Sequence, residues 1–276
     1  MLGEKNVFGP EEVEKTWGVR LEEAPDIPFF VEELERAREL GQFLILRVDK
    51  APDGQPLTMK KMNELLEDKF KGNKRKILYN ADWYKNEEFY TTDAPELHWA
   101  LVSRETIPNS TNKNYLQQMS RETIPNSTNK NYLQQTQELV RYLTDKVFKA
   151  QPISTEYQEA IDEFERYYRQ EFRGKTEQQI QELLSSSNWS RYAQGLSDLK
   201  INQLFRQMPV EVLYDMLMYF EASGRLLERN DIWTNRRSSS GLLVRVDSFS
   251  TVGAHVAHWS PGSSDAGLGV VFSRSH

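Results

Sequence analysis

The sequence predicts an α+β protein with a helix-rich middle. Between residues 28 and 102, segments with helical spacing of apolar residues alternate with short apolar runs that are typical of strands. From 137 to 224, apolar residues recur at intervals of three and four, which is the spacing of amphipathic helices. Beyond residue 228 they alternate instead, as in β-strands, with glycine-rich loops between the strands.

The N-terminal part divides into an arm and a module. Residues 1–27 are acidic and interrupted by prolines, which predicts an extended arm with a short helix near 11–16. In the α+β module over 28–102, we expect a helix at 30–40 that ends at Gly41, and a helix that is capped by Thr58. The expected strands of this module lie at 43–48, 76–79, 88–91 and 97–102.

A tandem duplication occupies residues 103–136. Its two halves, 103–119 and 120–136, are identical at 16 of 17 positions. Solenoid repeats are longer and need at least three copies, whereas an insertion in a surface loop costs little closure entropy. We therefore interpret the repeat as a recent duplication tolerated in a loop. The second copy is expected to begin the next helix, because Tyr132 and Leu133 continue in phase with the apolar residues that follow.

The region 137–224 is expected to be helical. Five mostly apolar residues share one face of its first helix: Leu133, Thr136, Val140, Leu143 and Val147. The second helix carries a largely aromatic stripe whose side chains are predicted to be buried in the core: Tyr157, Ile161, Phe164, Tyr168 and Phe172. Thr176 and Gln179 predict a capping box, and Pro209 predicts the first turn of a last helix that ends at Gly224.

Composition excludes several classes of function. The absence of cysteine excludes disulfides, thiol nucleophiles and zinc-thiolate sites. With only four histidines, a metal site built from histidine ligands is nearly excluded as well. A net charge of -6 gives no global basic field for nucleic acid, so we do not expect a nucleic-acid partner. No apolar export or membrane-spanning segment is recognisable, which predicts a cytoplasmic protein with no membrane partner. The sequence implies no cofactor and no metal.

Two clusters in the N-terminal module could carry chemistry, although each has a simpler interpretation. Five acids could supply a catalytic carboxylate pair, but the simpler interpretation is that they are ordinary surface residues: Asp82, Glu87, Glu88, Asp93 and Glu96. A basic run near aromatic residues could contact nucleic acid, but the simpler interpretation is a solvated helix end and loop: Lys69, Lys71, Lys74, Arg75 and Lys76. An enzyme or nucleic-acid-binding protein acting through this module is therefore the alternative function.

The strongest functional signal is a change of composition at the C-terminus. Glu, Lys, Gln and Met make up 67 of the first 228 residues, whereas none occurs in the last 48. An alternating strand at 242–246 and a second strand at 268–272 are expected in this tail. Its expected buried framework consists of the larger apolar residues Trp233, Leu242, Val244, Val246, Phe249 and Trp259.

Three segments of the tail carry a family resemblance: IWTNRR at 232–237, LLVRVDSF at 242–249 and GLGVVFSR at 267–274. They resemble the W-T-S-x-R segment, the central strand and the closing strand of C-type-lectin-like domains of the formylglycine-generating-enzyme type. The resemblance implies that residues 225–276 form the variable region of a mixed α/β lectin-like domain. Because the oxidase of that family depends on cysteines, only a binding role is implied, and no catalytic residue is expected.

More specifically, the tail is similar to variable regions of target proteins of diversity-generating retroelements, and the N-terminal stretch resembles an uncharacterised bacterial module found with such tails. In those systems template adenines are randomised, and the resulting pyrimidine-ending codons cannot encode Lys, Glu, Gln, Met or Trp. The resemblance implies a display protein that binds an unidentified protein or surface ligand. Its implied ligand-binding residues are Arg237, Asp247, Ser248, Ser250, His255, His258, Ser263 and Asp265.

The two tail histidines, His255 and His258, also bear on a metal site. On a strand, residues three apart would point to opposite faces, so zinc binding is not expected. We expect them to lie in exposed loops.

Overall fold

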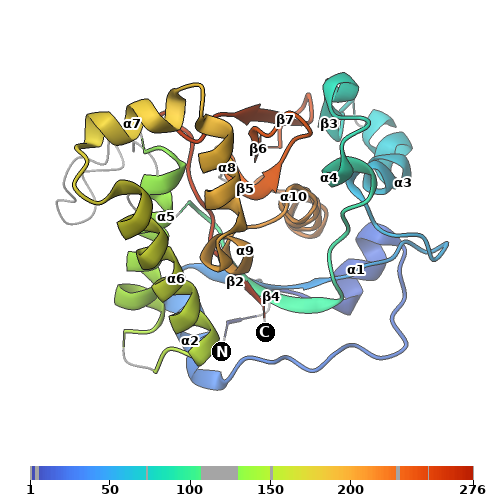
Figure 1. Cartoon of the computed structure of the whole chain (residues 1–276). Helices are drawn as coiled ribbons and strands as arrows, with labels where there is room; N and C mark the ends of the chain where they lie inside the picture. The colour runs from blue at the N-terminus through green and yellow to red at the C-terminus, as the bar shows by residue number, and fades with distance from the viewer. Residues whose placement is uncertain are drawn as a thin grey trace.

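The computed structural model describes residues 2–3, 6–72, 74–106, 130–149, 152–227, 231–247 and 249–275. Two four-stranded sheets lie on either side of helix α10 (Pro209–Ser223), and the remaining helices pack around them (Figure 1). The α+β class predicted from the sequence is confirmed.

The first sheet has the strand order β1-β2-β4-β8. β1 (Val7–Phe8) runs parallel to β2 (Gln42–Arg47), whereas β4 (His98–Ser103) and β8 (Ser273–Ser275) each run antiparallel to their neighbour. All six residues of β2 are buried, which agrees with its four central apolar residues; the buried end residues, Gln42 and Arg47, are polar. The last described residues of the chain therefore complete a sheet that its N-terminal part begins.

The second sheet has the order β3-β7-β6-β5 and positions the candidate site. β5 (Ile232–Arg237), β6 (Leu243–Val246) and β7 (Ala254–Trp259) form an antiparallel meander from the tail. β3 (Leu78–Tyr79) comes from the N-terminal part and pairs parallel with β7. Both sheets thus contain strands from each end of the sequence.

Helix α10 is buried because its sequence is apolar on all sides. Pro209 occupies its first turn, and Gly224 ends it with a positive φ of 69°, as the sequence predicted. The helix also carries Asp215, whose carboxylate accepts two hydrogen bonds from Arg47 of β2 at 3.1 and 2.9 Å. Burial opposes the charge of Arg47, but the carboxylates of Asp215 and Glu211 outweigh it and raise the pKa of the guanidinium. This buried ion cluster fixes α10 against the first sheet.

Most helices from the first part of the chain pack at one end of the sheets (Figure 1): α1 (Pro10–Trp17), α3 (Met59–Gly72), the 3-10 turn η2 (Ala81–Trp83) and α4 (Glu88–Thr91). α2 (Val31–Glu39) lies at the other end, where Arg36 donates to the Lys146 carbonyl. The predicted helix ends at Gly41 and the Thr58 cap are confirmed, since Gly41 has a φ of 69° and the Thr58 hydroxyl accepts from the Lys61 amide. The strand expected at 88–91 is wrong. Phe89 and Tyr90 are both buried within one helical turn, and so short an apolar run does not distinguish strand from helix.

The helices of the middle region cover the other end. They are α5 (Tyr132–Tyr142) with its π-helical extension η4 (Leu143–Val147), α6 (Thr155–Phe172), α7 (Glu177–Ser185), α8 (Trp189–Asp198) and α9 (Lys200–Phe205). The capping box of Thr176 and Gln179 is confirmed. The strand expected at 268–272 is wrong, because there only Gly269 forms a bridge, to Ile232, and the strand follows at β8.

The duplication is described only at its two ends. Ser103, the first residue of the first copy, lies in β4, and Asn131 of the second copy caps α5 by accepting from the Gln134 amide. The second copy therefore begins the helix, as predicted. Most of the loop expected from the first copy, residues 107–119, lies outside the described residues.

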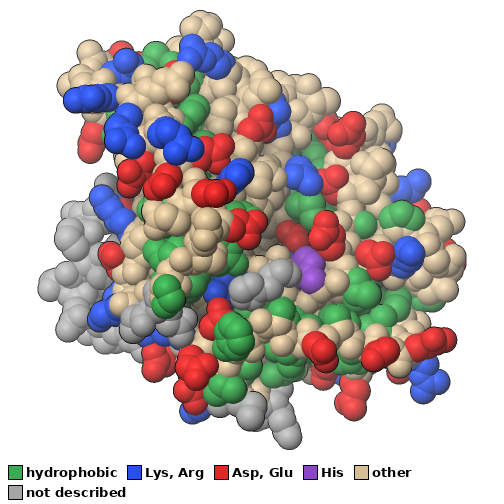
Figure 2. All heavy atoms as spheres, turned by 60° about the horizontal axis from the view of Figure 1, so that its bottom comes forward, with side chains coloured by type: hydrophobic (Ala, Val, Ile, Leu, Met, Phe, Trp, Pro, Cys, Tyr) green, Lys and Arg blue, Asp and Glu red, His purple; other side chains and the backbone are tan. Residues whose placement is uncertain are grey.

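The surface combines charged and apolar side chains. On the face drawn in Figure 2, acidic and basic side chains are interspersed, and hydrophobic ones gather over the lower half of the view. Exposed apolar side chains of the N-terminal arm and α2 include Ile27, Phe30 and Val31. Within the described parts of the chain, no helix is both long and apolar enough to cross a membrane.

Candidate functional site

The cross-strand register gives the second sheet two unlike faces. Its inner face packs against α10 and consists of the buried apolar residues Leu78, Ile232, Val244, Val246, Ala254 and Val256. Its outer face carries the alternate residues of the same strands. Helices cover the β5 side of this outer face, where Trp233 contacts Tyr132 of α5 at 5.6 Å between ring centroids. The β3 side remains partly exposed.

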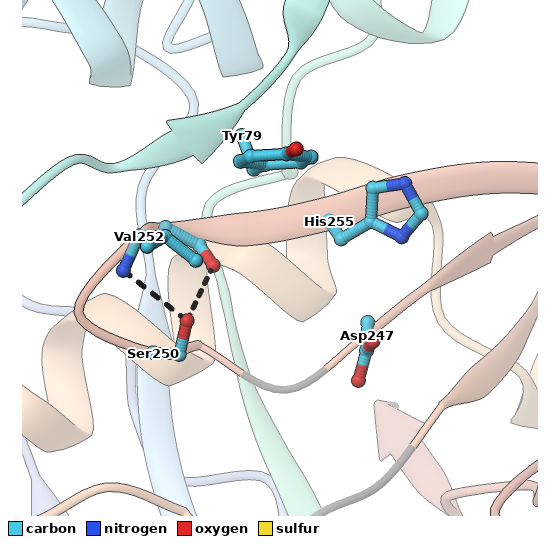
Figure 3. Close-up of a pocket in the computed structure, with 6 residues that line it drawn as sticks. Tyr79, Asp247, Ser250, Val252 and His255 are labelled. Carbon is cyan, nitrogen blue, oxygen red and sulfur yellow. Dashed lines mark hydrogen bonds between the residues drawn. The ribbon is translucent and has the colours of Figure 1, made fainter.

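Three outer-face side chains form a row that crosses strands β3 and β7 and ends at Asp247, the residue that follows β6. Tyr79 pairs directly with His255, and the Asp247 amide donates to the His255 carbonyl at 2.7 Å, which sets Asp247 opposite His255 on the other side. The Tyr79 and His255 rings are 5.7 Å apart at 67°, an edge-to-face arrangement. Figure 3 shows the three side chains with the turn that borders them.

The turn from Ser250 to Gly253 forms one wall of a pocket beside this row. The Ser250 hydroxyl accepts from the Val252 amide at 3.3 Å and donates to the Gly253 carbonyl at 3.2 Å (Figure 3). Gly253 has a φ of 103°, and its Cα lies so close to β3 that an added Cβ would be 2.8 Å from the Leu78 carbonyl carbon. The pocket has a volume of about 380 Å³ and is lined by Tyr79, Asp247, Ser250, Val252, Gly253 and His255.

Charges next to the row are mostly acidic. Arg245, on β6, forms an ion pair with Asp231 and lies over the Trp259 ring at 4.1 Å. Burial lowers the pKa of Arg245, while the charges of Asp247 and Asp265 act in the opposite direction. Three aspartates therefore surround one arginine on this part of the outer face.

The structure brings together three of the eight implied binding residues: Asp247, Ser250 and His255 all line the pocket. Arg237 lies at the end of β5, 3.9 Å from Asp198 of α8. Ser263 and Asp265 lie in the loop after β7, where Ser263 contacts the Ser260 hydroxyl and Asp265 accepts from the Gly267 amide. Ser248 falls outside the described residues.

His258 lies on the opposite face from His255. Its Nδ1 is 2.9 Å from the Ser238 hydroxyl, and its ring centroid is 4.3 Å from that of Trp83. Burial lowers the pKa of His258, against the charge of Glu87. Both histidines lie on β7, so the expectation of loop positions is wrong, whereas their orientation to opposite faces follows from the alternation of side chains along a strand.

Most of the predicted framework is buried. Trp233, Val244 and Val246 are fully buried and Phe249 is 4 % exposed, which confirms those predictions. Trp259 is only partly buried, because its ring lies at the border of the outer face with Arg245 over it. Leu242 is also only partly buried, since β6 starts one residue later.

Two of the five acids of the N-terminal module form contacts with the C-terminal tail. The Asp93 carboxylate pairs with Arg236 at 2.7 Å, and Glu87 accepts from both the amide and the hydroxyl of Ser239 at 2.7 Å. These contacts fix the β5–β6 hairpin. Nowhere in the described ranges do three histidine, aspartate or glutamate side chains gather as a metal site would require.

The basic run is likewise engaged in structural contacts. Lys69 pairs with Glu221, Lys71 pairs with Glu67 at 2.8 Å, and Arg75 lies over the Phe220 ring at 4.9 Å.

Tyr79 lines the pocket, although the sequence placed it only among the aromatic residues near the basic run and not among the implied binding residues. Its side chain is 45 % exposed, although it belongs to a strand whose other residue, Leu78, is buried. The alternation in the sequence Leu-Tyr marks one inward and one outward side chain. The parallel pairing with β7, some 175 residues away, could not be read from the sequence.

Comparison with known proteins gives no relative for this chain: no family model, no curated protein and no solved structure matches it.

Proposed function

We propose that this protein is a ligand-binding display protein whose C-terminal tail presents a replaceable surface to a macromolecular partner. The observation that carries the proposal is the outer-face row beside the pocket, in which Asp247 and His255 of the tail lie next to Tyr79. The opposite face of the same strands is packed against α10. Side chains of the row can therefore change with little effect on the core.

The residue types of the tail support the same proposal. Asp, Ser and His at positions 247, 250 and 255 can all be encoded by pyrimidine-ending codons, which is the set that adenine randomisation of Asn codons produces. Trp233, which no such codon encodes, is fully buried and packs against Trp259 and Tyr132. A fixed framework with small polar residues around it is the arrangement that antibody binding sites use.

The proposal includes the family assignment. We take residues 225–276 as the variable region of a C-type-lectin-like domain in a target protein of a diversity-generating retroelement. Its support is the segment resemblance and the missing Lys, Glu, Gln and Met of the tail.

Binding is preferred over catalysis because of how the polar groups of the pocket are used. The Ser250 hydroxyl is hydrogen-bonded to its own turn, and within the described residues neither ring nitrogen of His255 forms a hydrogen bond with it. A nucleophile needs a base within hydrogen-bond reach. The partner is expected to cover an area of about 800 Å² on this protein, as ordinary interfaces do.

The test of the family assignment is the DNA around the gene. We expect a reverse-transcriptase gene and a template repeat that matches the 3′ end of this gene, with mismatches confined to template adenines. A gene neighbourhood without a template repeat, or mismatches spread over all four bases, would contradict the assignment.

A further inference from the structure

We infer that the end of the N-terminal arm and the start of α2 form a separate interaction surface, which binds a basic amphipathic helix of a partner protein. The apolar centre of this surface consists of Ile27, Phe30 and Val31, whose exposed fractions are 45 %, 74 % and 52 %. The arm packs on the first sheet, whereas the pocket of the tail lies on the second. The inference therefore gives the N-terminal part a role of its own and does not rest on the proposed function.

Phe30 is exposed although nothing in its own helix requires a phenylalanine there. It is the N-cap residue of α2, and its side chain makes no capping hydrogen bond. Ser, Thr, Asp and Asn are favoured at this position because their side chains accept from the amides of the first turn. The preceding residue, Phe29, is 6 % exposed and lies 5.1 Å from the Arg274 guanidinium of β8. One phenylalanine thus fixes the segment to the protein, and its neighbour presents a bare ring to solvent, as the aromatic anchors of interfaces do.

The backbone that carries Phe30 is held in place on both sides. Before it, the Pro25 carbonyl accepts from Nε1 of Trp99 in β4 at 2.7 Å. At the helix start, the Phe30 amide donates to the Glu33 carboxylate at 2.9 Å, and Glu33 pairs with Arg274 at 2.8 Å. An anchor on a backbone that is already ordered loses little conformational entropy when a partner binds.

Acidic side chains border the apolar centre. From residue 21 to residue 35 the chain has six acids and no Lys, Arg or His. Glu33 is engaged with Arg274, whereas five are exposed and, within the described residues, have neither an ion pair nor a hydrogen bond: Glu22, Glu23, Asp26, Glu32 and Glu35. Glu35 follows Val31 by four residues and so shares its face of α2. The arm runs along the lower side of Figure 1, and Figure 2, which turns that side forward, shows hydrophobic and acidic side chains close together there.

These charges select among the possible occupants of the surface. A second copy of the chain bound about a two-fold axis would place acids opposite acids. An anionic lipid surface would be repelled for the same reason. A helix with an apolar face flanked by lysine or arginine provides both an apolar contact for the ring of Phe30 and opposite charge for the acidic border.

The inference is tested by titrating the full chain with a capped peptide of about 18 residues, long enough to be helical, that has leucines along one face and lysines on both flanks. In one matched peptide glutamate replaces every lysine, and in the other glutamine replaces every leucine. We expect the lysine–leucine peptide to bind with a dissociation constant of about 10–100 μM and to shift the amides of Ile27 and of 30–35. Both matched peptides should bind at least tenfold more weakly.

Three variants assign the contacts. Phe30→Ser should weaken binding of the lysine–leucine peptide about tenfold, while the urea midpoint of the free chain stays the same or rises, because serine is a better N-cap. Asp26→Asn combined with Glu35→Gln should weaken binding about threefold and reduce its dependence on salt. Leu65→Gln is the control and should leave binding unchanged, since Leu65 is an exposed apolar residue of α3, at the opposite end of the sheets.

Equal binding of the lysine and glutamate peptides, shifts confined to residues outside 27–35, or undiminished binding in Phe30→Ser would overturn the inference. Self-association of the free chain that Phe30→Ser abolishes, measured by analytical ultracentrifugation, would assign the surface to a second copy and would overturn it as well. Binding to phosphatidylserine vesicles that Phe30→Ser abolishes would do the same in favour of a membrane.

Discussion

Gly253 controls whether the turn that borders the pocket can lie against β3. Its φ of 103° is a conformation that residues with a Cβ rarely adopt, and an added Cβ would lie 2.8 and 2.9 Å from the Leu78 carbonyl carbon and nitrogen. These contacts are with backbone, so no side chain can rotate away to relieve them. Gly253→Ala must therefore move β3 away from β7.

The cost of this substitution has two parts. A left-handed backbone costs about 1–2 kcal/mol for a residue with a Cβ, and forced displacement of packed groups costs about 1–3 kcal/mol. Gly174→Ala is the matched control, because Gly174 has a φ of 77° with no heavy atom within 4 Å of the added Cβ. Each substitution also reduces the conformational entropy of the unfolded chain by the same amount, so this effect cancels when the two variants are compared. Gly253→Ala should therefore lower the free energy of unfolding by about 1–3 kcal/mol more than Gly174→Ala.

Urea unfolding followed by circular dichroism measures this difference, and hydrogen exchange locates it. The Ala254 amide donates to the Ile77 carbonyl at 2.8 Å, so its exchange should accelerate in Gly253→Ala but not in Gly174→Ala. Equal stability of the two variants together with a protected Ala254 amide would refute the argument.

Three further predictions concern the framework, the duplication and pH. Trp233→Ala should cost about 3–5 kcal/mol and Trp259→Ala about half as much, since Trp233 is fully buried and Trp259 only partly; urea unfolding that gives equal costs would contradict this. Deleting 103–119 leaves the same sequence as deleting 107–123, so the contacts of β4 and the start of α5 are retained. The melting temperature should then move by about 4 °C at most, and loss of cooperative unfolding would refute the loop interpretation. Burial, with the charge of Arg47, lowers the pKa of His98 to about 4 from 6.5, so the unfolded chain takes up a proton first as pH falls between these values. Between pH 6.5 and 4, the free energy of unfolding of the wild type should therefore fall more steeply than that of His98→Gln, by up to about 1.4 kcal/mol per pH unit. Equal pH dependence of the two unfolding free energies would contradict the assignment.

Local sequence signals predicted the elements that rest on local chemistry. The Thr176 capping box, the Pro209 start of α10 and the Gly41 helix end all depend on residues within one turn of each other, and all three are present. Short apolar runs were less informative. Residues 88–91 form a helix and 268–272 an irregular segment, because burial alone favours either structure in so short a run.

The candidate site was only partly predictable for a different reason. The tail residues Asp247 and His255 were identified from composition and resemblance, but their neighbour Tyr79 is brought to them by a parallel pairing between distant segments. His258 was implied as a binding residue together with His255, but both lie on β7, where the alternation of side chains that the sequence analysis described puts them on opposite faces. The pairing of β3 with β7 leaves no pattern in either strand, so the position of Tyr79 could not be predicted without the structure.

The central claim is that the partly exposed β3 side of the outer face of the second sheet is replaceable whereas the inner face of that sheet is not. The direct measurement is the melting temperature of full-chain variants from two libraries, one randomised at Tyr79, Asp247 and His255 and the other at Val244, Val246 and Val256. The account predicts that most variants of the first library melt within a few degrees of wild type and that most of the second fail to fold, since buried valines cannot be replaced by polar residues without loss of the core. Similar losses in both libraries would contradict it.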